Sequence, residues 1–133
     1  MTKDQIDAAV KEALVGALGV GEDEVTPQAT LLGDLSAESI DLLDILFRLE
    51  RTTSVKIQAA DLAAHVQGGI PDDEFGDASG KITAKGMAQL KKVMPQIDAN
   101  ALAGQLEAEK VMSLFTVQNL TDMVAGRVAA KSA

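Results

Sequence analysis

The chain has 133 residues, and its aromatic residues are three Phe with no Tyr or Trp, so its core must be built from aliphatic side chains. A net charge of −8 lies within residues 1–50, where eleven acids face three bases, and residues 51–133 are neutral with nine of each. This acidity disfavours nucleic acid, whose phosphates would be repelled, and favours partners with basic patches. The length indicates one domain, or a small domain with an insertion.

Several kinds of site are excluded or disfavoured by the composition. The absence of cysteine rules out disulfides, thiolate metal ligands and a cysteine nucleophile. His65 is the single histidine, and no serine or acid stands at a spacing that suggests a catalytic triad. We therefore expect no catalytic residue and no metal site. No apolar run is long enough to span a bilayer and the first residues lack an apolar signal core, so we expect no membrane insertion and a cytoplasmic location.

The first predicted helix begins at Thr2, which forms a capping-box pattern with Gln5, and ends near Leu18. Gly19 or Gly21 allows the left-handed turn that stops it. A long loop broken by Pro27 and Gly33 follows. The apolar positions of this helix are Ile6, Val10, Leu14 and Leu18.

A second helix is predicted from Ser39 to about Arg51. Its charged residues at positions 41, 44, 48 and 51 share one narrow face, and apolar residues cover more than half of its circumference. A surface helix needs an apolar stripe of only about 100°. The surplus indicates either that the helix is buried on two sides or that part of its apolar surface serves a purpose other than the core.

The segment from Gly33 to Asp44 closely resembles the attachment site of the acyl carrier protein family. The resemblance extends to the first helix and loop, through Leu18-Gly19-Val20, Glu24-Val25-Thr26 and Asp34-Leu35, and to Phe115-Thr116-Val117-Gln118 at the start of the last helix. It implies that Ser39 carries a covalent 4′-phosphopantetheine, and that the chain is a non-enzymatic carrier of acyl groups bound as thioesters.

The family resemblance also implies roles for the neighbours of Ser39. The expected partners are a phosphopantetheinyl transferase, and ketosynthases and acyltransferases with basic patches; the cargo is a fatty-acyl chain, and the carrier is a monomer. The expected docking residues are Glu38, Asp41, Asp44, Ile40 and Leu42, and the expected acyl pocket is formed by Leu43, Leu46, Phe47 and Ile57.

Four positions depart from the family pattern. Glu38 replaces the usual aspartate before the serine and keeps its charge. Gln58 stands where proline is usual, Thr53 where an aromatic core residue is common, and Arg51 where the family usually has an acid. These departures leave the expected fold intact and bear on the detailed choice of partner.

The second half of the chain interrupts the carrier pattern. A short extended link at 55–57 and a helical turn at 58–64 precede a turn-rich acidic loop at 68–80. Further helices are predicted from Thr83 to before Pro95, from 99 to 110, and from Thr116 onward. We therefore predict an all-α, acyl-carrier-like four-helix bundle (residues 1–62 and 113–130) with a helical insertion at 63–112. We expect the insertion to close over the second helix and enlarge the pocket for a long acyl chain, which deletion of residues 66–110 would test.

Two alternatives to a specialised fatty-acid or lipid carrier are kept. A peptidyl or aminoacyl carrier would share the fold, although the acidity of residues 1–50 favours fatty-acyl partners. A non-modified helical adaptor would have the carrier fold and bind a protein through residues 63–112. Without its flanking matches, Ser39 would be read as a serine that caps a helix.

Overall fold

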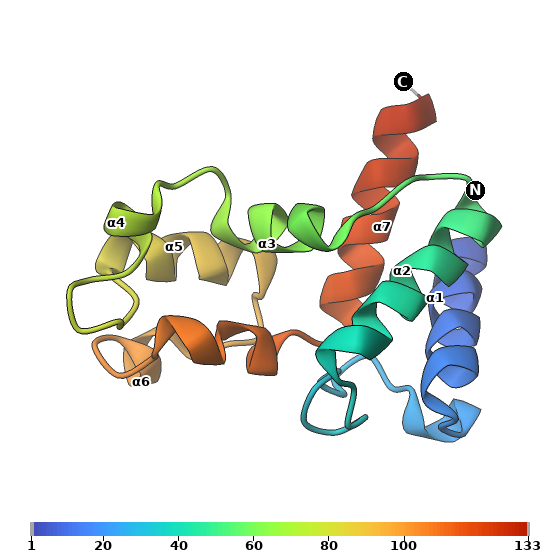
Figure 1. Ribbon diagram of the computed structural model, residues 1–133, viewed down its shortest axis with the longest axis horizontal. Coiled ribbons are helices and arrows are strands. Elements are labelled where there is room, and N and C mark those ends of the chain that lie inside the picture. The colour runs from blue at the N-terminus through green and yellow to red at the C-terminus, as the bar shows by residue number, and fades with distance from the viewer. Residues whose placement is uncertain (1, 133) are drawn as a thin grey trace. The chain divides into compact units, whose positions relative to one another are not determined.

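The computed structural model describes residues 2–132, with the side chains of all of these except Ser39, Ala59, Ala63, Glu109 and Ser132. Within the described residues the regular elements are helices, joined by isolated β-bridges, which confirms the predicted all-α class. In chain order they are α1 (Lys3–Leu18), η1 (Glu22–Glu24), α2 (Ser39–Thr53), α3 (Ala59–Gln67), α4 (Asp72–Phe75), α5 (Ala84–Val93), α6 (Ala99–Leu102), η2 (Ala108–Leu114) and α7 (Val117–Ser132) (Figure 1).

The chain divides into two compact units. The first comprises Met1–Ala59 with Phe115–Ala133, and the second comprises Ala60–Leu114. The segment predicted as an insertion, residues 63–112, falls within the second unit.

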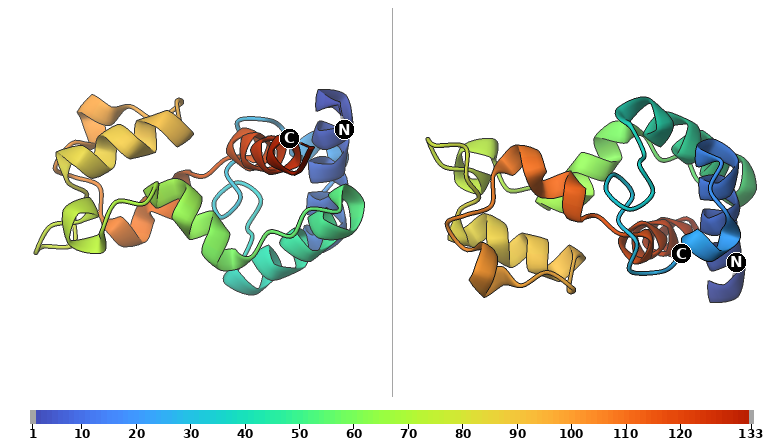
Figure 2. Two further views of the ribbon diagram at one scale, coloured as in Figure 1. Left: turned by 90° about the horizontal axis from the view of Figure 1, so that it is seen from above. Right: turned by 90° about the horizontal axis from the view of Figure 1, so that it is seen from below.

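In the first unit, α1 packs against both α2 and α7 (Figures 1 and 2). Helix α1 has the predicted capping box: the Thr2 N–H donates to Gln5 Oε1 at 2.8 Å, and the Gln5 N–H donates to Thr2 Oγ1 at 3.2 Å. The helix ends where Gly19 adopts the left-handed conformation with φ 69°. The buried apolar side chains of this unit are aliphatic except for Phe115, and the most deeply buried include Val10, Leu14, Ile45, Leu49, Phe115, Leu120 and Val124.

In the second unit, α5 begins and ends as predicted. Thr83 Oγ1 accepts a hydrogen bond from the Gly86 N–H at 3.1 Å, and the helix stops at Val93, two residues before Pro95. The acidic loop differs from the prediction in containing one turn of helix, α4, which buries Phe75.

The helix predicted over residues 99–110 is wrong. Helix α6 ends at Leu102, and the 3₁₀ segment η2 begins only at Ala108. The cause is Gly104, which has φ 74° and so lies in the left-handed region that a right-handed helix cannot contain. Sequence periodicity suggested continuity because Leu102 and Leu106 have helical spacing, and in the structure Leu106 is buried by the loop instead.

Candidate functional site

The loop before α2 is fixed at several points. The Thr30 N–H donates to Asp34 Oδ2 at 2.9 Å, and the Asp34 N–H donates back to Thr30 Oγ1 at 3.0 Å. The Leu31 N–H donates to the Phe115 carbonyl at 3.1 Å, so the loop is also tied to the start of α7. Two apolar residues of the loop, Leu35 and Ala37, are buried. The backbone that leads into α2 is therefore held at both ends.

Ser39 is the first residue of α2, and the predicted modification falls on a side chain that lies outside the described part of the structure. The preceding residue, Glu38, is extended and caps the helix, with its N–H donating to Asp41 Oδ2 at 2.9 Å. Both sequence neighbours of Ser39, Glu38 and Ile40, are exposed. Position 39 is thus a helix N-terminus between two exposed residues, where backbone N–H groups and the helix dipole favour a phosphate.

The predicted docking residues have different environments. Glu38 and Asp44 are exposed, whereas Asp41 and Leu42 are half-buried. Asp41 accepts the capping hydrogen bond described above, and Asp44 Oδ1 accepts one from Arg48 Nε at 3.0 Å. Two of the three acids therefore also stabilise α2, a role that the sequence reading missed although the spacing of Glu38 and Asp41 is that of a capping box.

The apolar surplus of α2 is divided between two surfaces. Ile45, Leu46 and Leu49 face the core and are buried. On the outer side, Ile40, Leu43 and Phe47 are 71%, 57% and 58% exposed, which is unusual for side chains of this size. Their spacing of three and four residues places them in one row along the helix. This row provides an exposed apolar surface that begins one residue after Ser39.

The four residues predicted to form an acyl pocket lie around one hollow within the first unit. It has a volume of about 220 Å³, which is smaller than the about 300–1,000 Å³ typical of small-molecule sites. Its apolar part is formed by the middle of α2 and by Ile57 in the extended segment after the helix, and the polar side chains of Glu50, Lys56 and Gln58 complete the rim. The lining residues are Leu43, Leu46, Phe47, Glu50, Lys56, Ile57 and Gln58.

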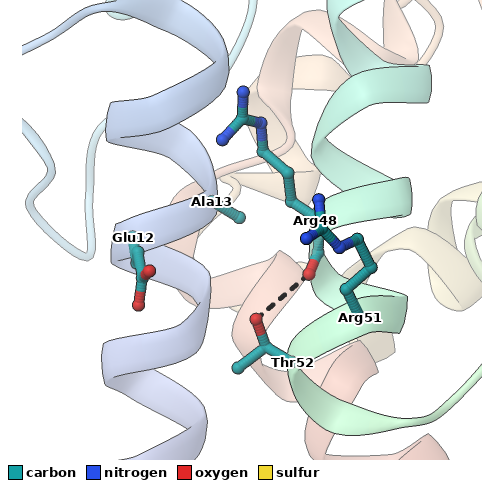
Figure 3. A pocket seen from close by; sticks show the side chains of 5 residues that line it. All are labelled: Glu12, Ala13, Arg48, Arg51 and Thr52. Carbon is teal, nitrogen blue, oxygen red and sulfur yellow. Dashed lines mark hydrogen bonds between the residues drawn. The ribbon is translucent and has the colours of Figure 1, made fainter.

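A second hollow, of about 330 Å³, lies between α1 and α2 (Figure 3). Glu12 and Ala13 of α1 face Arg48, Arg51 and Thr52 of α2 across it. Gly16 makes this arrangement possible: a Cβ at Gly16 would stand 2.4 Å from Arg48 Nη1. The sequence reading did not connect Gly16 with Arg48; a glycine inside a helical pattern was the available signal.

The described residues contain no group of three or more His, Cys, Asp or Glu side chains placed to hold a metal ion. Across residues 2–132, no helix combines the length and the apolar composition needed to cross a membrane.

Residues 8–67 match the family described as phosphopantetheine attachment site. The chain is 42% identical over 62 residues to the acyl carrier protein of Petrotoga mobilis, a match that covers 47% of this chain and 73% of that protein. The acyl carrier protein of Thermotoga maritima is 39% identical over 61 residues, covering 46% and 75%. That of Rubrobacter xylanophilus is 37% identical over 57 residues, covering 43% and 70%.

The chain belongs to the acyl carrier protein family. Acyl carrier proteins are carriers rather than enzymes, and they bear a covalent 4′-phosphopantetheine group. They carry acyl chains and interact with synthase and transferase enzymes. No solved structure gives a significant match to this carrier.

The residues present fit the phosphopantetheine group. A helix of 15 residues begins at position 39, the loop before it is fixed by hydrogen bonds, and both neighbours of the serine are exposed. The Asp41 carboxylate is turned to the Glu38 backbone N–H, so its negative charge is partly compensated by that bond.

Proposed function

We propose that this carrier holds acyl intermediates as thioesters on a 4′-phosphopantetheine arm attached to Ser39, in a specialised fatty-acid or lipid pathway. The observation that supports this most is the position of Ser39 at the start of α2, inside the matched residues 8–67. When attached, the arm supplies the thiol that bears the acyl group. The carrier supplies the hydroxyl and the helix N-terminus, and we assign the base and the bound coenzyme A to the transferase.

Incubation with a broad phosphopantetheinyl transferase and coenzyme A tests this attachment. Wild-type protein should gain one phosphopantetheine mass, and Ser39→Ala should gain none. Ser36 is the matched control because it is an exposed serine in the loop that leads into α2, three residues before Ser39. Its φ of 57° suits glycine, so Ser36→Gly should fold and be modified normally. A mass gain that survives Ser39→Ala would place the modification at another residue. Absence of the gain from the wild type would leave the unmodified adaptor as the better hypothesis.

We further propose that the hollow around Phe47 shelters the start of the acyl chain, together with Leu43, Leu46 and Ile57. The hollow is small, so a chain of more than a few carbons requires its side chains to move apart. Phe47 forms an outer wall and is more than half exposed, which means that it can be truncated without opening a cavity in the core.

Phe47→Ala should therefore speed the cleavage of an octanoyl thioester by hydroxylamine by about tenfold at most. Full burial of a Phe side chain is worth about 1.5–3 kcal/mol of free energy, and the partly exposed Phe47 can contribute only part of that to sheltering the thioester. The cleavage can be followed by mass spectrometry. Ile40→Ala removes a similarly exposed side chain that does not line the hollow, and should leave the rate unchanged. Equal rates in the wild type and Phe47→Ala would remove Phe47 from the pocket.

For partners, we propose the phosphopantetheinyl transferase, ketosynthases and acyltransferases with basic patches. The exposed Glu38, the charge carried by residues 1–50 and the apolar row on α2 support this choice. We also propose that residues 63–112 are an insertion that specialises the carrier. They lie almost entirely beyond the matched residues 8–67, and they fall in the second compact unit.

A further inference from the structure

The two ends of α2 carry opposite charges. Asp41 and Asp44 lie in its first half, whereas the second half holds Arg48, Glu50 and Arg51 and so carries a net positive charge. This order is favourable for the helix dipole, which attracts acids to the N-terminus and bases to the C-terminus. The dipole would account for the two arginines if their guanidinium groups served to cap the carbonyls at the C-terminal end of α2.

The end of α2 is already supplied with donors. Thr52 Oγ1 donates to the Arg48 carbonyl at 3.1 Å, and Thr53 Oγ1 donates to the Leu49 carbonyl at 2.6 Å. The Ser54 N–H donates to the Glu50 carbonyl at 2.8 Å. Among the described residues, the side chain of Arg51 makes no hydrogen bond to a carbonyl of the last turn, so it does not cap the helix.

The two arginines differ in how they are held. Arg48 Nε pairs with Asp44 at 3.0 Å, and its guanidinium packs against the bare backbone of Gly16. Among the described side chains, no carboxylate lies within 4.0 Å of the Arg51 guanidinium. Arg51 is exposed, and its Cζ lies 5.9 Å from the centre of the Phe47 ring. Within the described side chains Arg51 thus forms no ion pair, and its guanidinium lies over the ring of Phe47, one member of the exposed apolar row of α2.

We propose that Arg51 and Phe47 form the basic end of a docking surface whose other end is Glu38 and Asp41. This inference rests on the proposed function, since it concerns the enzymes that meet the carrier. The partner it fits is an acyl-transfer enzyme with a basic groove for the acidic end of α2, an apolar seat for Phe47, and a carboxylate opposite Arg51. An enzyme whose docking face is uniformly basic would meet Arg51 as a like charge, so the reversal of charge along α2 selects among partners.

The geometry favours a protein carboxylate over a phosphate at Arg51. Glu12 lines the same hollow as the two arginines and would repel a doubly charged group there (Figure 3). A single carboxylate that approaches over the Phe47 ring reaches Arg51 from the exposed side. The planar guanidinium can then donate two parallel hydrogen bonds to it.

The test uses Arg51→Glu in the full-length carrier, loaded with phosphopantetheine before use. Each ketosynthase and acyltransferase of the source organism is purified, and its affinity for the carrier is measured at low salt. For at least one of these enzymes, Arg51→Glu should weaken binding on the order of tenfold, because an attraction becomes a repulsion. Arg51→Gln should weaken binding to the same enzyme by a smaller factor, and it avoids placing an acid in the last turn of α2.

Lys3→Glu is the matched control. It changes the net charge by the same amount, at a lysine whose side chain is 82% exposed in a surface pair with Asp7. This control should leave binding unchanged or strengthen it slightly. Replacing the facing acid of the enzyme by arginine should restore its affinity for Arg51→Glu. If Arg51→Glu binds every enzyme as well as the wild type, or more tightly, the proposal is overturned. Normal loading of Arg51→Glu by the transferase would show that the proposed function survives that result.

Discussion

The two compact units are stabilised in different ways. The first is built from α1, α2 and α7, each of 15 or 16 residues, which share a core of aliphatic side chains and Phe115. In the second unit the helices after α3 have 4, 10 and 4 residues, lengths at which a helix in water is marginal or unstable on its own.

Polar side chains compensate by fixing the turns of the second unit. Lys91 Nζ donates to the carbonyls of Pro95 at 2.6 Å and Ile97 at 2.7 Å, beyond the end of α5. The Thr83 hydroxyl donates to the Glu74 carbonyl and so joins the start of α5 to α4. The comparison shows that long helices around a shared apolar core build the unit with the attachment site, whereas the other unit joins short helices through its turns; side-chain-to-backbone bonds fix turns in both units.

Truncating one fully buried leucine in each unit gives the largest expected effects. Leu49 of α2 and Leu90 of α5 are both 0% exposed. Leu49→Ala should lose about 2–5 kcal/mol of unfolding free energy, and Leu90→Ala should fall nearer the lower end, because short helices can close more of the cavity. Urea unfolding gives the totals, and amide hydrogen exchange shows which unit each change loosens. Equal loss of protection across both units in both variants would contradict the division into two separately stabilised regions.

An intermediate effect is expected from adding a methyl group to one glycine in each unit. A Cβ at Gly86 would stand 2.6 Å from the Phe75 carbonyl oxygen and 2.8 Å from Ile82 Cγ2, so Gly86→Ala should cost about 1–3 kcal/mol. Gly126 is exposed in α7, and a Cβ there would meet no atom within 4 Å. Gly126→Ala should therefore stabilise the protein by about 0.5–1 kcal/mol. Thermal unfolding measures both, and a neutral Gly86→Ala would show that the contact between α4 and α5 is not tight.

The difference between the units also explains what the sequence could predict. Helix α1, with its cap at Thr2 and its stop at Gly19, and helix α5, with its cap at Thr83, follow from local patterns that act within a few residues. The break at Gly104 was missed, because apolar spacing suggested a longer helix and a glycine is compatible with either outcome.

At the candidate site, the sequence located α2 and its surplus of apolar residues but could not assign that surplus to a surface. Which residues are buried depends on how α2 packs in the first unit: Ile45 and Leu49 are buried, and Leu43 and Phe47 are exposed. The placement of Arg48 against Gly16 joins positions 32 residues apart, and only the packed helices bring them together. The resemblance to a known family supplied the role of Ser39, which local patterns alone describe as a helix-capping serine.

The smallest expected effect concerns Asp77 in the turn between α4 and α5. The Ser79 hydroxyl donates to Asp77 Oδ1 at 2.6 Å, and the backbone N–H groups of Lys81 and Ser79 donate to the same atom. These bonds, that of the Ser79 hydroxyl first, hold the pKa of the Asp77 carboxyl below its ordinary value of 3.8. Since the folded pKa lies below the unfolded one, the contribution of Asp77 to stability is complete above the unfolded pKa and is lost as pH falls through the folded pKa.

Ser79→Ala should accordingly raise the pKa of Asp77 toward its ordinary value, which an NMR titration of the side-chain carboxyl would measure. The variant should also make hydrogen exchange in this turn faster at neutral pH, because the carboxylate keeps only its backbone donors. Ser113→Ala removes another exposed serine hydroxyl of the second unit, which donates to the Lys110 carbonyl, and should leave the Asp77 titration unchanged. An identical Asp77 pKa in the wild type and Ser79→Ala would mean that the Ser79 hydroxyl does not stabilise the carboxylate and that this turn of the second unit is held by its backbone donors alone.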